Sequence, residues 1–237
     1  AQSAPAPGDG LMYIGAFPRR FFIIEEATGN IAGEIPMQKG TPRGTFLSQD
    51  KKRFYVMADN MEDCEVVDIA GRRVTDTFRL SESAAKKTRL RGMAVDPQEN
   101  YAILLTRPYT KHIDRWEIGA NTIVQYDLKA KKVMRTIPWP GGQEREGAFF
   151  KFSPDGKNLF LFGDDIVVLN TSDWKEADKW ELSRPIEDGF GRINFNQMDE
   201  TYEEPGFMTG IFQVQDAVQN RSIMGIARVN LQKKSVD

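Results

Sequence analysis

Cysteine and histidine are almost absent from this chain. Among 237 residues there is one cysteine, Cys64, and one histidine, His112. A single cysteine can form no internal disulfide, no C-x-x-C pair and no C-x-x-C-H haem attachment. A lone histidine also excludes a metal site built from several histidines. We therefore expect this chain to bind no cofactor and no metal ion.

Long apolar runs and a surplus of positive charge are missing as well. A membrane-spanning helix needs about 18 consecutive apolar residues, whereas the most apolar runs here, such as residues 159–162, have the length of a strand. The formal net charge is −2, so the chain has no basic field that would attract nucleic acid or an anionic membrane. We expect neither membrane insertion nor a nucleic-acid partner.

The first ten residues are small, rich in proline and uncharged until Asp9. This composition is typical of the flexible start of a mature exported protein, just after the signal peptide has been cleaved. The sequence thus predicts a periplasmic or secreted protein.

An internal repeat is the strongest feature that the sequence does contain. Residues 48–57, 96–105 and 153–162 align as a polar turn followed by an apolar strand, and residues 191–200 form a weaker copy. A short β-prone run opened by a glycine precedes each turn, so each unit begins as a hairpin. A second apolar strand and turn follow in every unit and can be aligned five times.

The spacing of the repeats identifies the architecture. The turns begin at Ser48, Asp96, Ser153 and Asn196, at intervals of 48, 57 and 43 residues. Blades of four strands repeat every 40 to 50 residues or so. The sequence therefore predicts an all-β fold, a β-propeller of four-stranded antiparallel blades with about five blades in this chain. The long interval indicates an inserted loop, residues 106–119, between the second and third strands of its blade.

The predicted organisation is a flexible N-terminus at residues 1–10 and a propeller domain at 11–237. Residues 81–91 are expected to connect two blades with at most one helical turn. The last repeat breaks off where its outermost strand should begin, which favours part of a larger ring, such as a seven-bladed one, over a five-bladed ring with shared terminal strands. The expected blades are approximately residues 11–37, 44–80, 91–138, 147–182 and 190–237.

One blade carries a family resemblance. Residues 91–97, an inserted loop ending at 113–118, and residues 122–127 follow one another as in exported YVTN-type propellers. Among these, the chain resembles the propeller (β) subunit of quinohemoprotein amine dehydrogenase. In that family the haems and the tryptophan-derived quinone lie on companion subunits. The resemblance therefore implies a non-catalytic platform in a redox complex with other protein subunits.

The inserted loop concentrates residues that are common in protein contacts. Tyr109, His112, Arg115 and Trp116 combine aromatic rings with charge, a composition typical of binding interfaces. These four residues are candidate contacts with a partner. The alternative is a solvated loop whose Trp116 packs on the edge of the sheet.

Three arginines form a second set of candidates. Arg43, Arg91 and Arg192 lie beside the glycines that begin three innermost strands, and in a propeller these strands surround the mouth of the central channel. Guanidinium groups there could hold a small anionic ligand or an acidic residue of a partner through bidentate contacts. The alternative is that they are solvated or paired with neighbouring acids.

No residue can be assigned to catalysis. Asp50, Asp68, Asp127 and Asp155 recur at turn positions, so turn formation explains them better than acid–base chemistry. The leading hypothesis is an exported non-catalytic subunit, a scaffold or a platform that binds a partner or ligand. The alternative is a propeller hydrolase or lactonase that uses acidic residues of the channel face, with a divalent cation held by oxygens.

Overall fold

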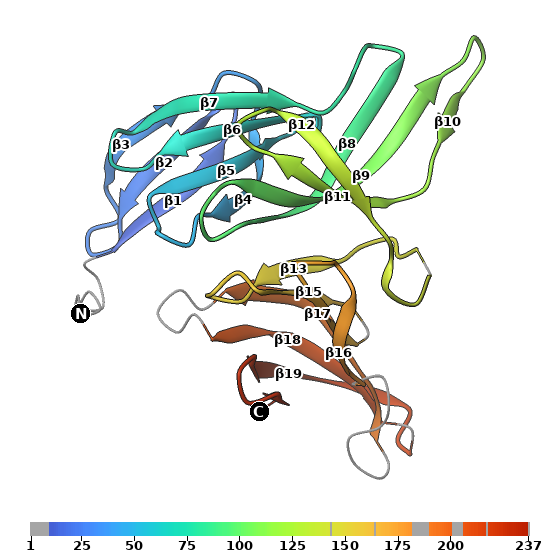
Figure 1. Cartoon of the computed structure of the whole chain (residues 1–237). Coiled ribbons are helices and arrows are strands. Elements are labelled where there is room, and N and C mark those ends of the chain that lie inside the picture. The colour runs from blue at the N-terminus through green and yellow to red at the C-terminus, as the bar shows by residue number, and fades with distance from the viewer. Residues whose placement is uncertain are drawn as a thin grey trace. The chain divides into compact units, whose positions relative to one another are not determined.

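The computed structural model describes residues 10–142, 144–163, 165–181, 190–200, 206–216 and 218–236. The chain divides into two compact units, the first comprising Ala1–Val95 and Glu99–Arg135, the second Asp96–Gln98 and Thr136–Asp237. Antiparallel sheets make up both units (Figure 1), and the only helix in the described part is the short 3₁₀ turn η1 (Pro140–Gly142).

Three sheets form the first unit, and within each sheet most neighbours in sequence are also neighbours in space. The first sheet contains β1 (Leu11–Ala16), β2 (Arg20–Glu25) and β3 (Ile31–Pro36). The second sheet contains β4 (Pro42–Leu47), β5 (Arg53–Ala58), β6 (Asp63–Asp68) and β7 (Arg73–Arg79). The third sheet contains β8 (Lys86–Val95), β9 (Tyr101–Lys111), β10 (Trp116–Ile118), β11 (Thr122–Asp127) and β12 (Lys132–Ile137).

The second unit consists of two sheets of four strands in sequence order. The fourth sheet of the chain contains β13 (Phe149–Phe152), β14 (Asn158–Phe162), β15 (Ile166–Asn170) and β16 (Glu176–Trp180). The fifth contains β17 (Phe190–Glu200), β18 (Phe207–Asp216), β19 (Arg221–Asn230) and β20 (Ser235–Val236). The chain is thus all-β, with the four-stranded antiparallel blades of a β-propeller and about five of them.

Strand β5 shows why the central strands have continuous apolar sequences. Phe54 and Val56 pack towards the first sheet, whereas Tyr55 and Met57 pack towards the third. A strand that is covered on both faces needs apolar side chains at both odd and even positions. The ring of Phe54 lies 5.0 Å from that of Tyr13, so aromatic contacts join the first two sheets.

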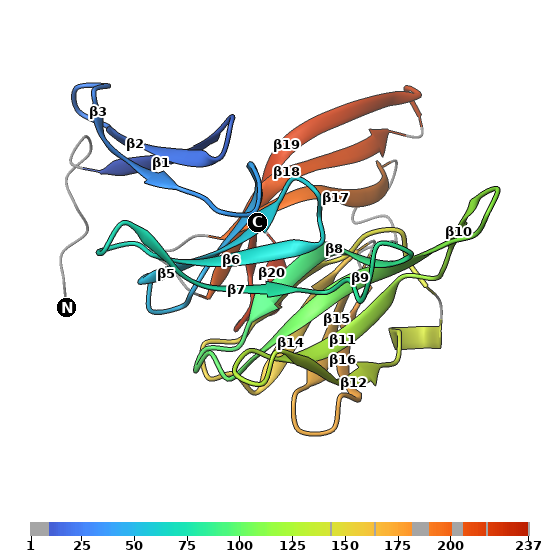
Figure 2. The same cartoon turned by 90° about the horizontal axis from the view of Figure 1, so that it is seen from above.

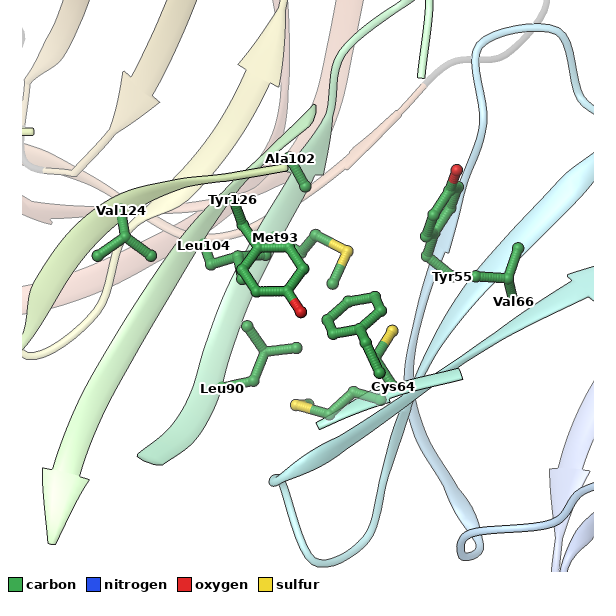
Figure 3. Close-up of a cluster of buried hydrophobic side chains, with 11 residues drawn as sticks. Tyr55, Cys64, Val66, Leu90, Met93, Ala102, Leu104, Val124 and Tyr126 are labelled. Atoms are coloured by element: carbon green, nitrogen blue, oxygen red, sulfur yellow. The ribbon is translucent and has the colours of Figure 1, made fainter. Parts of the chain in front are cut away.

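A larger cluster joins the second and third sheets (Figure 3). Cys64 of β6 and Phe78 of β7 pack there against Leu104 of β9 and Tyr126 of β11. Burial raises the pKa of the Cys64 thiol, and the negative charge of Glu65 raises it further. Cys64 is therefore a neutral core residue.

Polar groups close the tight turns of the repeat. Ser48 Oγ donates to Asp50 at 2.7 Å and accepts the N–H of Arg53 at 3.0 Å. The same arrangement recurs one hundred and five residues later, where Ser153 Oγ donates to Asp155 at 2.6 Å. The turn-forming role predicted for these two aspartates is confirmed. Asp127 also behaves as predicted, because it accepts the N–H groups of residues 129 and 130.

Two predictions about the third sheet are wrong. Residues 81–91 were expected to connect blades, but β8 begins at Lys86 and pairs with β9. The insertion was expected to be a loop, but β9 runs on to Lys111 and β10 pairs with it. Where β9 extends beyond the blade, both of its edges would expose backbone N–H and C=O groups. Pairing with β8 on one edge and β10 on the other satisfies these groups. In Figure 1 these strands extend beyond β11 and β12, and Figure 2 shows the same for β9 and β10.

Candidate functional site

The candidate site is a three-stranded extension of the third sheet, which we call the ribbon. It consists of residues 86–90 of β8, residues 106–111 of β9, and β10 with its flanking turns. A β-bulge separates the ribbon from the blade, because Leu90 pairs with Thr106 while Gly92 pairs with Leu105, which leaves Arg91 as the extra residue. A bulge of this kind bends the strand and raises its local twist.

The pairing register places four cations of the ribbon together on one face. Lys87 lies opposite Tyr109, and Arg89 lies opposite Arg107, and directly opposed side chains point to the same side of a sheet. The guanidinium of Arg89 lies 4.7 Å from the centre of the Tyr109 ring, which agrees with this register. Strand β10 adds Trp116 opposite Lys111 and Ile118 opposite Tyr109.

This face, which we call the basic face, combines positive charge with apolar surface and carries no acidic residue. Trp116 is 42% exposed and Ile118 is 55% exposed. One of its cations is paired outside the ribbon, since Lys87 Nζ lies 2.6 Å from Glu62 Oε1. The members of the basic face are Lys87, Arg89, Arg107, Tyr109, Lys111, Trp116 and Ile118.

The opposite face of the ribbon is different in character. It carries Lys86, Thr88, Thr110 and Glu117, so charges of both signs and neutral hydroxyls occur there. The two faces of one ribbon therefore differ in charge and in apolar content, and a partner with an acidic surface would distinguish them.

The tip of the ribbon is a closed turn. The N–H of His112 donates to the carbonyl of Arg115 at 2.8 Å, and His112 Nε2 lies 2.8 Å from Glu117. Arg115 lies 3.2 Å from the carboxylate of its neighbour Asp114. Ile113, between them, is fully exposed. His112 thus closes the turn through its hydrogen bonds, and Arg115 pairs with its neighbour on the surface. Ile113 adds exposed apolar surface at the tip.

The structure brings four of the predicted contact residues into this ribbon. Tyr109 and Trp116 lie on the basic face, and His112 and Arg115 lie at the tip. Sequence reasoning missed Lys87 and Arg89 because β8 was expected to be a connection. The available signal was Leu90, a buried apolar residue that continues the strand backwards from Gly92.

The predicted arginines occupy equivalent backbone positions. Arg43 and Arg91 are the extra residues of β-bulges in β4 and β8, the first strands of two successive sheets. Both are exposed, and neither has an ion pair with a described residue. The register of β17 also shifts between Phe190 and Ile193, around Arg192. The side chain of Arg192 lies outside the described part of the structure, so its contacts stay a prediction.

Neither a cluster of metal ligands nor a membrane-spanning helix occurs among the described residues. No group of three or more histidine, cysteine, aspartate or glutamate side chains in that part could hold a metal ion. None of the helical segments described is long and apolar enough to cross a bilayer.

Comparison with known proteins gives a likeness of fold. No family model and no curated protein matches the sequence, whereas 1099 chains of solved structures match the structure. One is hydrazine synthase of Kuenenia stuttgartiensis, with a TM-score of 0.58 and 13% sequence identity over 98% of this chain. This chain covers 63% of that one, and at such low identity the likeness concerns the fold alone.

Proposed function

We propose that this chain is an exported, non-catalytic propeller subunit that binds a protein partner through the basic face of the ribbon. The observation that carries the proposal is the juxtaposition of exposed Trp116 and Ile118 with cations and without acids on one face. Large exposed apolar residues mark interaction sites when they gather in one patch. Aromatic residues and arginine are also the types that contribute most to protein interfaces.

The charge of the ribbon indicates the kind of partner. The whole chain has a net charge of −2. The basic face nevertheless carries Arg89, Arg107 and Lys111 in addition to Lys87, which forms an ion pair with Glu62. An acidic partner surface would be attracted to this face and oriented by it. The apolar side chains would then be desolvated in the centre of the contact.

Within this proposal the partner belongs to an amine-dehydrogenase-like redox complex in the periplasm or the extracellular space. The sequence resemblance rests on residues 91–97, 113–118 and 122–127, and these segments include or flank the ribbon. Haem and quinone would lie on companion subunits, and this chain would supply the platform. Arg43 and Arg91 remain candidates for contact with a small anion or an acidic partner residue.

Affinity purification of the chain from its native host tests this proposal. A partner is expected to co-purify in fixed stoichiometry with the unaltered chain, and the double substitution Trp116→Glu and Ile118→Glu should release it. Val133→Glu with Met134→Glu is the matched control, because these residues of β12 are 52% and 49% exposed but lie outside the ribbon.

Two results would contradict the proposal. One is retention of every stoichiometric partner by the ribbon variant at an unchanged melting temperature. The other is turnover of a substrate, or tight stoichiometric Ca²⁺ binding, by the isolated chain, which would instead support the hydrolase or lactonase alternative.

A further inference from the structure

The first unit contains a cleft that the proposed function does not use. Its volume is about 450 Å³, and residues from four separate segments of the chain line it. Its lining includes Lys39 after β3, Thr77 and Arg79 at the end of β7, and Tyr126 and Lys131 around the end of β11.

Arg79 is held in place by a buried acid. Its Nε and Nη2 donate to the two oxygens of Asp63 at 3.0 and 2.9 Å, and Asn60 donates to the same carboxylate at 2.7 Å. The side chain of Asp63 is 7% exposed and that of Arg79 is 56% exposed. The guanidinium is therefore oriented in advance, and its Nη1 makes no hydrogen bond to a described residue.

Lys39 is the second cation of the cleft. The N–H groups of Gln38 and Lys39 donate to the buried carboxylate of Glu65, each at 2.8 Å, so the backbone of this connection is fixed. The exposed ammonium of Lys39 has no ion pair with a described residue. The backbone that carries this ammonium is thus ordered before a ligand binds, and the charge is available to pair with an anion.

Lys131 and Thr77 are two further polar residues of the cleft lining. Lys131 is already satisfied, because its Nζ contacts Asp76 and the carbonyl of Thr77. The hydroxyl of Thr77 has no hydrogen bond to a described residue. Lys131 and Asp76 neutralise each other. Among the other residues that line the cleft, Lys39 and Arg79 carry two positive charges and Asp63 carries one negative charge.

Two stacked rings supply the apolar part of the lining. The centres of Phe78 and Tyr126 lie 4.9 Å apart, with an interplanar angle of 30°. Figure 3 shows Tyr126 among the side chains between the second and third sheets. The buried hydroxyl of Tyr126 has no hydrogen-bond partner in the described structure, and burial raises its pKa to about 12, so it stays a neutral donor.

We propose that this cleft binds a small organic oxyanion, with its charged group held by Lys39 and Arg79 and its apolar part against Phe78 and Tyr126. Guanidinium and ammonium groups recognise carboxylates and phosphates through charge-assisted hydrogen bonds. An apolar group of the ligand would cover the edge of the aromatic pair. The site is separate from the ribbon, and its test does not depend on the proposed partner.

Ligand-observed NMR and calorimetry on the full chain test the cleft. The probes are benzoate, phenyl phosphate, inorganic phosphate and the neutral isostere benzamide. Benzoate or phenyl phosphate should bind more tightly than benzamide, and Lys39→Met should weaken that binding by about tenfold, the size expected for a charge-assisted hydrogen bond. Whichever of the two phenyl probes binds more tightly identifies the carboxylate or the phosphate as the preferred group.

The control is Lys129→Met, which removes an exposed lysine two residues from Lys131 but outside the cleft lining. It should leave the affinity unchanged, and both variants should retain the melting temperature of the unaltered chain. The proposal would be overturned if neither benzoate nor phenyl phosphate bound more tightly than benzamide, if both variants lost affinity equally, or if no anionic probe bound at millimolar concentration. Tighter binding of inorganic phosphate than of both phenyl probes would overturn the assignment of the aromatic pair.

Discussion

Arg107 Nε donates a hydrogen bond of 3.1 Å to the backbone carbonyl of Gly119. The N–H of Gly119 donates to the carbonyl of Pro108 at 3.0 Å, and the reciprocal bond of an antiparallel pair would come from the nitrogen of residue 108. Proline has no N–H to give. The side chain of Arg107 therefore replaces the missing backbone donor, and this allows a proline in the central strand of the ribbon.

Replacement of Arg107 by methionine should loosen the base of the ribbon. Because the carbonyl of Gly119 would lose its donor, we expect the free energy of unfolding to fall by about 1 kcal/mol. We also expect the amide of Gly119 to exchange its hydrogen faster. Denaturant titration and hydrogen exchange measure these effects.

Arg89→Met is the matched control for this prediction. It removes a cation from the same face, above Tyr109, and leaves the hydrogen bond to Gly119 intact. Equal protection of the Gly119 amide in both variants would show that Arg107 does not support this carbonyl.

A side chain at position 119 should disrupt the same junction. A Cβ on Gly119 would lie 2.7 Å from Cγ of Pro108, and the proline ring cannot move aside as a flexible side chain can. We expect Gly119→Ala to reduce the free energy of unfolding by about 1 to 3 kcal/mol, as overpacking does elsewhere. Gly147→Ala is the control, because a Cβ there meets no atom within 4 Å. Equal stability of the two variants would contradict the close approach of Gly119 and Pro108.

The ion pair at the root of the ribbon should make stability depend on pH. Burial raises the pKa of Glu62, but the hydrogen bonds from Lys87 and Ser81 and the nearby positive charges outweigh burial and leave the pKa below 4.5, the ordinary value. Folded protein therefore releases this proton at lower pH than unfolded protein does. The stabilisation is present above pH 4.5 or so and is lost as the pH falls through the folded pKa.

Urea titrations between about pH 3 and pH 6 measure this contribution. The unaltered chain should lose more stability on acidification than Glu62→Gln, in which nothing titrates at this position. Lys87→Met should also flatten the dependence, since it removes the main partner of the carboxylate. Parallel curves for all three proteins would show that this pair does not contribute.

The repeated turns could be predicted from sequence because they are local. Ser48 and Asp50, like Ser153 and Asp155, form their hydrogen bonds within a few residues of the chain. The bulges were also marked in the sequence, since a glycine follows Arg43 and Arg91 directly. Turns and bulges of this kind are set by residues that are close together in the sequence, so their residue types predict them.

The ribbon and the cleft depend on pairing between distant segments, which leaves little local signal. The start of β8 contains Lys86 and Lys87, a residue type depleted in strands, and it becomes a strand because β9 offers an edge. In the cleft, Lys39, Arg79 and Lys131 come from three turns or strand ends. Each resembles an ordinary surface residue until the sheets are packed together.

Strand β8 belongs both to the blade and to the ribbon. Residues 92–95 form the first strand of the blade, residues 86–90 form one side of the ribbon, and the bulge at Arg91 lies between them. A force applied at Trp116 would pass through β9 to both parts of β8, because β9 is paired with β10 and along the whole of β8. The bulge bends and twists β8 locally, so a force transmitted along this strand would meet its least regular point at Arg91.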